Sequence, residues 1–244
     1  MPALYPKIPH LSGSRTGPSD RHVSRQREHT LTVAAREGAR IVVEEKLDGT
    51  CVVVAREGDS VVAYGRDGRL ARSSRNVGRR LFARWVFEER ERLFGLLDGF
   101  ERACGEWLPL AHGTIYDLPH EPFVLFDLLD DKKALSREQM ADRARAAGLT
   151  VPCIIHVGAA LPTSEALLRL GAGGKHGADA AEGVVYREED PRDGTCRFVA
   201  KLVRHTKIDG LYLADHTGKD HVFNTWPGSQ EWLAEALAED EAPS

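Results

Sequence analysis

The sequence predicts a mixed fold in which short strands and helices alternate along the chain. Three strand-like runs follow one another at residues 41–46, 50–57 and 60–66, with a hairpin turn between the last two. Residues 73–100 then carry apolar side chains close to helical spacing, which indicates one long helix or two consecutive ones. The 244 residues are 42% hydrophobic and 29% charged, so the chain is long enough for one sizeable core.

The second half of the chain also alternates between strand and helix patterns. Strands are predicted at five runs of apolar residues: 102–108, 122–129, 151–157, 183–188 and 197–203. The run at 122–129 is almost entirely apolar and should therefore be central. Ser136 and Gln139 form a capping box that opens a helix, which Gly148 should close. Further helices are expected at 164–170 and 229–237, and the glycine-rich run 171–177 is interpreted as a connector.

The two ends of the chain carry weaker patterns. Residues 1–39 are rich in Pro, Gly, Ser, Arg and His, so we expect an irregular lead-in with a short helix near 30–37. This lead-in could lie over the site or be flexible. The first residues hold no apolar run of signal-peptide length, and nowhere do eighteen apolar residues follow one another. We therefore expect a cytoplasmic protein with no membrane partner.

Cysteine usage and net charge exclude some function classes. The four cysteines lie about fifty residues apart without a paired spacing, which disfavours structural zinc and disulfides: Cys51, Cys104, Cys153 and Cys196. The net charge of −4 argues against nucleic-acid binding by bulk charge. Nine arginines between positions 66 and 92 could still grip phosphates locally. From Arg84 onward, a solvated helix face paired with neighbouring glutamates is the favoured interpretation.

The most informative feature is the tetrapeptide Lys46-Leu47-Asp48-Gly49, which directly follows the strand-like run 41–45. A lysine at the end of a strand, next to a turn, can present its amine to a nucleotide phosphate. The pattern alone is weak, because average composition places it by chance in roughly one chain in twenty of this length.

The tetrapeptide becomes a specific signal only together with four later segments: Gly105-Glu106-Trp107, Phe123 to Asp127, Glu182 to Val185, and Phe198 to Leu202. With them, the chain resembles the covalent nucleotidyltransferase superfamily of ATP-dependent ligases and mRNA capping enzymes. The spacing is most similar to the phage-type RNA ligase 2 family. The resemblance implies an α+β nucleotidyltransferase (ATP-grasp-like ligase adenylation) domain, with antiparallel sheets enclosing an ATP cleft.

The resemblance also assigns roles to the phosphate-binding residues. Lys46 would attack the α-phosphate of ATP and hold AMP as a phosphoramidate, and Lys201 would bind phosphate and assist catalysis. Arg66 would contact nucleotide or RNA phosphate, although an arginine at the end of a hairpin can also be solvent-exposed without a binding role. The family often repeats a lysine two residues after the position of Lys201. This chain has Val203 there, and Arg204 or Lys207 could substitute.

Four further residues receive roles on the nucleotide and the metal. Glu106 would accept hydrogen bonds from the ribose hydroxyls, and Phe126 would stack on adenine. Glu182 would hold a catalytic Mg²⁺, for which Mn²⁺ could substitute. Glu45 would help to position adenine. Three of them also have ordinary structural alternatives: Glu106 as an exposed strand-end glutamate, Glu182 as a turn-adjacent glutamate and Phe126 as a core residue.

Chemistry adds one requirement to this assignment. A free lysine, with a pKa of about 10.4, is deprotonated in only about one molecule in a few thousand at pH 7. We expect Lys201 and a bound metal ion to disfavour the ammonium form of Lys46.

The predicted organisation is a lead-in at 1–39, a nucleotidyltransferase domain at 40–210 and a short extension at 211–244 without an OB domain. The predicted function is ATP-dependent sealing of RNA 5′-phosphate and 3′-hydroxyl ends through a lysyl-AMP intermediate and an RNA-adenylate. Two alternatives stay open: a nucleotidyltransferase that needs a protein partner for RNA joining, and a non-catalytic RNA-binding module. The motifs alone distinguish neither ATP from GTP nor one RNA substrate from another.

Overall fold

A computed structural model describes residues 3–131, 133–171, 176–177 and 179–241 of the chain. Within these ranges the strands form one nine-stranded sheet in the order β3-β2-β4-β5-β6-β9-β8-β1-β7. All neighbouring strands in it are antiparallel. The strands are β1 (Arg40–Lys46), β2 (Thr50–Glu57), β3 (Ser60–Gly65), β4 (Arg102–Trp107), β5 (Phe123–Asp130), β6 (Lys133–Ala134), β7 (Ile154–Gly158), β8 (Gly183–Glu189) and β9 (Cys196–Val203). The helices are α1 (Arg25–Thr32), η1 (Ala71–Ser73), α2 (Val77–Glu88), α3 (Arg90–Leu96), α4 (Arg137–Ala146), α5 (Thr163–Leu170), α6 (Ala214–Thr217) and α7 (Ser229–Glu241).

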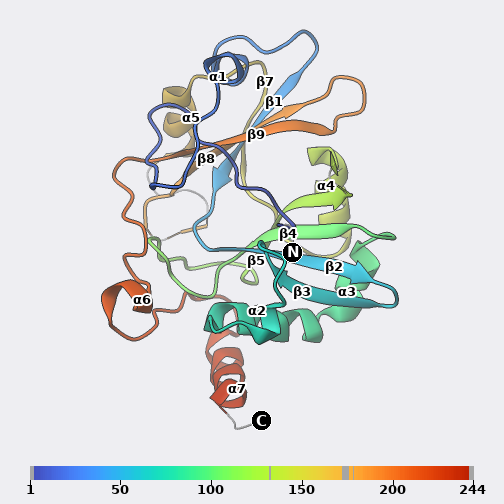
Figure 1. The fold of residues 1–244 in the computed structure, drawn as a ribbon, viewed down its shortest axis with the longest axis vertical. Coiled ribbons are helices and arrows are strands. Elements are labelled where there is room, and N and C mark those ends of the chain that lie inside the picture. Colours follow the sequence, from blue (N-terminus) through green and yellow to red (C-terminus); the bar gives the residue numbers. More distant parts are fainter. Residues whose placement is uncertain (1–2, 132, 172–175, 178, 242–244) are drawn as a thin grey trace.

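The sheet divides into two halves. Strands β1, β7, β8 and β9 form the upper half in Figure 1, and β2 to β5 form the lower half. The short β6 joins them, since it pairs with β5 on one side and its Ala134 pairs with Cys196 of β9 on the other. The α+β class with antiparallel pairing is thus confirmed, in one sheet with two halves where separate sheets were expected.

Each half buries its own hydrophobic core. The lower core gathers Trp85 of α2, Trp107 of β4 and Phe123 of β5, and includes residues from α3, α4 and α7. The upper core gathers Ile41 and Tyr186 of the sheet beneath α1 and α5. The chain passes from the upper half to the lower half between β1 and β2, so the Lys46 tetrapeptide lies at the junction of the halves.

Local sequence signals explain most elements. Ser136 and Gln139 form the predicted capping box of α4, and Gly148 beyond its end has a φ of +65°. The 73–100 pattern becomes the consecutive helices α2 and α3, as predicted. The hairpin between β2 and β3 closes where Glu57 pairs with Ser60.

Some boundaries differ from the predictions. The helix expected near 30–37 is wrong in position, because Ser24 caps α1 by accepting a hydrogen bond from the Arg27 amide and the helix ends at Thr32. β7 begins at Ile154, three residues after the predicted start of that strand. The elements β6, η1 and α6 were not predicted. Residues 172–175 of the glycine-rich connector lie outside the described residues.

The C-terminal extension packs on the lower half. Helix α7 lies beneath α2 in Figure 1, and the Arg80 guanidinium of α2 contacts the Asp240 carboxylate of α7 at 2.5 Å. All four cysteines carry thiols, in line with the sequence. None of the helices in the described ranges has the length and apolar character needed to cross a lipid bilayer.

Candidate active site

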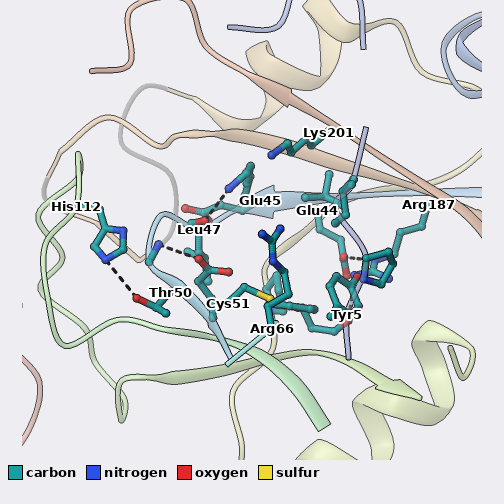
Figure 2. A pocket seen from close by; sticks show the side chains of 18 of the residues that line it. Tyr5, Glu44, Glu45, Leu47, Thr50, Cys51, Arg66, His112, Arg187 and Lys201 are labelled. Carbon is teal, nitrogen blue, oxygen red and sulfur yellow. Dashed lines mark hydrogen bonds and ion pairs between the residues drawn. The ribbon is translucent and has the colours of Figure 1, made fainter. Parts of the chain in front are cut away.

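A pocket of about 370 Å³ lies between the two halves of the sheet. Its lining combines residues of both halves with part of the N-terminal lead-in: Tyr5, Pro6, Ile8, Glu44, Glu45, Lys46, Leu47, Gly49, Thr50, Cys51, Arg66, Arg79, Glu106, His112, Phe126, Pro152, Val185, Arg187 and Lys201. Figure 2 shows Tyr5 and Arg187 at one end of this pocket and His112 and Thr50 at the other. Six of the seven residues proposed from the sequence line it, and the seventh, Glu182, contacts Lys46.

Lys46 is the last residue of β1, and its amine is held by two acceptors. The Nζ atom donates to Glu182 Oε2 at 2.5 Å and to the Leu47 carbonyl at 3.0 Å. Strand register explains the first contact, because Lys46 pairs with Gly183 at the start of β8, next to Glu182. A side chain at Gly183 would collide with the Leu202 carbonyl of β9, so the Glu-Gly sequence lets the strands approach closely.

The charge state of Lys46 differs from the expectation. Burial disfavours its ammonium form, but the Glu182 and Glu106 carboxylates outweigh burial and raise the pKa of Lys46 above its ordinary value. The pKa of Lys201, by contrast, is lowered by burial and by the charge of Lys46. The described residues therefore hold Lys46 as an ammonium, where the sequence argument expected an uncharged amine.

The turn after Lys46 is fixed by hydrogen bonds. The Gly49 amide donates to Glu106 Oε1 at 2.9 Å, and the Asp48 amide donates to the Tyr116 hydroxyl at 2.9 Å. The Asp48 carboxylate accepts from the Gly113 amide at 2.7 Å. A Cβ atom on Gly49 would lie 2.6 Å from the Trp107 carbonyl, so this position requires glycine. Asp48 thus orients the turn.

Lys207 and Arg204 do not take the place of a second phosphate-binding lysine. The Lys207 amine lies 2.6 Å from Asp48 Oδ2 and also contacts the Thr114 hydroxyl, with its side chain 5% exposed. The Arg204 guanidinium donates to the Gly171 carbonyl. The expectation of a substitute is therefore not met in this structure. Lys207 supports the Lys46 turn through Asp48.

The other sequence-predicted residues surround the pocket from separate strands. Figure 2 shows Arg66 and Lys201 on opposite sides of it. Phe126 of β5 packs against Tyr5, with ring centroids 5.2 Å apart. Burial raises the pKa of Glu106 to about 7, although the Lys46 charge opposes the shift.

A buried charge network at one end of the pocket was missed by sequence reasoning. Arg187 Nε lies 2.6 Å from the Glu44 carboxylate, and its Nη1 lies 2.6 Å from Asp127 Oδ1. Glu44 also pairs with Arg137, and Asp127 also accepts a hydrogen bond from the Tyr5 hydroxyl. Asp127 interrupts the apolar sequence of β5, and this interruption was the available signal.

The positive charge of the arginine-rich helices α2 and α3 is largely neutralised by neighbouring carboxylates. Arg84 lies 2.7 Å from Glu88, and Arg92 lies 2.9 Å from Glu89. The pairing with neighbouring glutamates from Arg84 onward is thus confirmed, but the Arg84 side chain is only 20% exposed and also contacts Glu239 of α7. Of the arginine stretch, Arg66 and Arg79 line the pocket.

The acidic groups beside Lys46 suit a magnesium ion. Among the described residues, no group of three or more His, Cys, Asp or Glu side chains has the arrangement of a metal cage. Mg²⁺ does not need one, since it typically binds through one or two carboxylates together with water and substrate phosphates. Glu182, which is buried and reaches Lys46, would provide such a carboxylate.

Comparison with known proteins agrees with this architecture. The family model described as RNA ligase matches residues 39–203. A search of curated proteins finds no match. The solved structures that resemble the chain include three variants of the Naegleria gruberi RNA ligase. A lysine-to-alanine variant with ATP and Mn has a TM-score of 0.53 and 18% identity, and the match covers 90% of this chain and 64% of that one.

Two other variants, each with AMP and Mn, have a TM-score of 0.51. The lysine-to-methionine variant is 19% identical and the glutamate-to-alanine variant 18% identical, and both matches cover 82% of this chain and 62% of the other. The chain therefore spans less than two thirds of the length of these ligases. The fold is that of these RNA ligases. The chain belongs to the RNA ligase family.

Proposed function

We propose that this chain is an ATP-dependent RNA ligase that seals RNA 5′-phosphate and 3′-hydroxyl ends. The observation that carries the proposal is the convergence of Lys46, Glu106 and Phe126 with Lys201 on one pocket, from four different strands. We assign this activity to a domain at 40–210, with residues 1–39 as a lead-in and 211–244 as a C-terminal extension.

The proposed first step uses Lys46 as the nucleophile. Its amine loses a proton and attacks the α-phosphorus of ATP, an N–P bond forms, and the bond to the leaving pyrophosphate breaks. AMP then passes to the RNA 5′-phosphate to give an RNA-adenylate. Attack by a 3′-hydroxyl finally expels AMP and seals the strand. The N. gruberi structures with ATP or AMP and Mn support this choice of nucleotide and divalent cation.

The pocket residues supply the binding that these steps need. Phe126 offers an aromatic face for adenine, and Glu106 offers a carboxylate for the ribose hydroxyls. Arg66 and Lys201 face the pocket from opposite sides and would stabilise charge on the phosphates. Glu45 would help to position the base. A Mg²⁺ or Mn²⁺ ion, held by Glu182, would supply further positive charge at the α-phosphate.

A sealing assay tests the proposal. The chain is incubated with a nicked RNA duplex that carries a 5′-phosphate, together with ATP and Mg²⁺. We expect a joined strand from the wild-type chain and none from Lys46→Ala. No joined product and no AMP on the enzyme would contradict the proposal.

A second candidate is a nucleotidyltransferase that needs a protein partner for RNA joining, and the net charge of −4 favours it, because bulk charge does not attract RNA to this chain. That candidate predicts AMP on Lys46 without sealing by the isolated chain. If the chain is instead a non-catalytic RNA-binding module, it should not bind ATP, and its RNA affinity should survive Lys46→Ala.

A further inference from the structure

The N-terminal lead-in crosses the pocket from one half of the sheet to the other. Its residues 4–15, here named the N-terminal strap, begin at β3, where the Leu4 amide donates to the Arg66 carbonyl at 2.9 Å. They continue along β9, where the Lys201 amide donates to the Pro9 carbonyl at 3.0 Å and the Leu11 amide donates to the Lys201 carbonyl at 2.8 Å. The strap is thus bonded to the backbone of both cations that face each other across the pocket.

Tyr5 is a strap residue that lines the pocket. The residue is 5% exposed, and its ring packs against Phe126 at an interplanar angle of 59°. Its hydroxyl donates to Asp127 Oδ2 at 2.5 Å, while Asp127 Oδ1 is paired with Arg187. Tyr5 therefore uses its polar atom on the protein and presents its ring to the cavity and to Phe126.

Phe126 is consequently held at two points. Arg187 Nη2 donates to its backbone carbonyl at 3.0 Å, and the Tyr5 ring lies against its side chain. A tilted aromatic contact of this kind restricts ring rotation and adds stabilisation beyond the area it buries. Without the Tyr5 ring, the Phe126 ring would lose its neighbour on the strap and gain rotational freedom.

We propose that Tyr5 is a positioning residue for the nucleotide base, which fixes the Phe126 ring and closes the base end of the pocket. This inference rests on the proposed function, because it takes the occupant of the pocket to be an adenine nucleotide. Ground-state positioning by the ring affects nucleotide binding more than the chemical step. Loss of Tyr5 should therefore raise KM for ATP and leave kcat for self-adenylylation nearly unchanged.

Two substitutions distinguish the effect of the Tyr5 ring from the effect of its hydroxyl. Tyr5→Ala removes both, whereas Tyr5→Phe keeps the ring and deprives Asp127 of a hydrogen bond. We expect Tyr5→Ala to raise KM for ATP and the Kd of ATP about tenfold, with kcat within threefold. We expect Tyr5→Phe to lower the unfolding midpoint in urea while KM stays within twofold of the wild type. Phe87→Ala, an exposed aromatic truncation on α2 outside this pocket, is the matched control and should change neither constant.

The test combines equilibrium ATP binding, measured in a Lys46→Ala background, with adenylylation kinetics in the Lys46-containing chain. Weaker ATP binding in Tyr5→Ala, but not in Tyr5→Phe, supports the inference even if no adenylylation occurs, in which case the proposed function alone fails. Equal ATP binding by Tyr5→Ala and its parent overturns the inference and leaves the proposed function intact. A fall in kcat with unchanged KM also overturns it, and absence of ATP binding in the parent overturns both proposals.

Discussion

The Lys46 amine lies 2.5 Å from the Glu182 carboxylate, so the proposed nucleophile is one half of a largely buried ion pair. This contact joins the end of β1 to the residue before β8. It keeps the amine in place, and it also keeps the amine protonated. Reaction requires that the pair open and that Lys46 lose its proton.

Removing the Glu182 charge should separate these two effects. In Glu182→Gln, the burial of Lys46 is opposed by less negative charge, so the pKa of Lys46 falls. We expect an acylating reagent at pH 8 to modify Lys46 several-fold faster than in the wild type, as measured by peptide mass spectrometry. AMP incorporation should nevertheless fall on the order of a hundredfold, because the carboxylate that we propose holds the metal ion at the α-phosphate is lost. The exposed Glu165→Gln variant serves as the control, and slower modification of Lys46 in Glu182→Gln would contradict the ion-pair account.

The rate of self-adenylylation should depend steeply on pH. Because the pKa of Lys46 is raised, the uncharged amine is a minor species throughout the neutral range, and its fraction grows about tenfold per pH unit. Single-turnover rates at saturating ATP should therefore rise about tenfold per pH unit between pH 6 and 8. A rate that is flat across this interval would show that Lys46 is already neutral or that another step is limiting.

Glu106 should make the protein less stable as the pH rises. Its pKa is about 7 in the folded chain against an ordinary value of 4.5, mainly because of burial. The folded state then binds more protons than the unfolded state between these values, so stability falls as the pH rises from 4.5 to 7. Glu106→Gln should raise the free energy of unfolding by roughly 1–3 kcal/mol at pH 8 and by less near pH 4.5. Urea unfolding at both pH values checks this, with exposed Glu138→Gln as the control. A pH-independent difference would refute it.

The Asp48–Lys207 pair should contribute to stability as a unit. Lys207→Met leaves the Asp48 carboxylate without its cation in a mostly buried place, which should cost about 2–4 kcal/mol. The double variant Asp48→Asn, Lys207→Met should lose less than the sum of the two single variants. A double-mutant cycle in urea measures this coupling, and strictly additive losses would show that the pair does not act as a unit.

The features that could be predicted from the sequence are those that depend on local patterns. The capping box at Ser136, the hairpin after Glu57 and the apolar run of β5 each depend on residues within a few positions of one another. The order of the motif segments was also visible, and the structure brings Lys46 and Glu182 together across 136 positions.

The missed features depend on contacts between distant residues. The lead-in has no periodicity, so nothing in it indicated that the Tyr5 hydroxyl would bond Asp127, 122 positions away. The charge state of Lys46 likewise depends on the sum of burial and carboxylates from other strands, which only three-dimensional placement determines. Lys207 was named as a possible second phosphate-binding lysine because its ion-pair partner, Asp48, lies far away in the sequence.

The central claim is that Lys46 becomes covalently adenylylated, and intact-mass spectrometry followed by peptide mapping tests it most directly. After incubation with ATP and Mg²⁺, the wild-type chain should gain one AMP on the peptide that contains Lys46, and Lys46→Ala should gain none. No AMP on the wild-type chain, or an equal gain on Lys46→Ala, would contradict the claim.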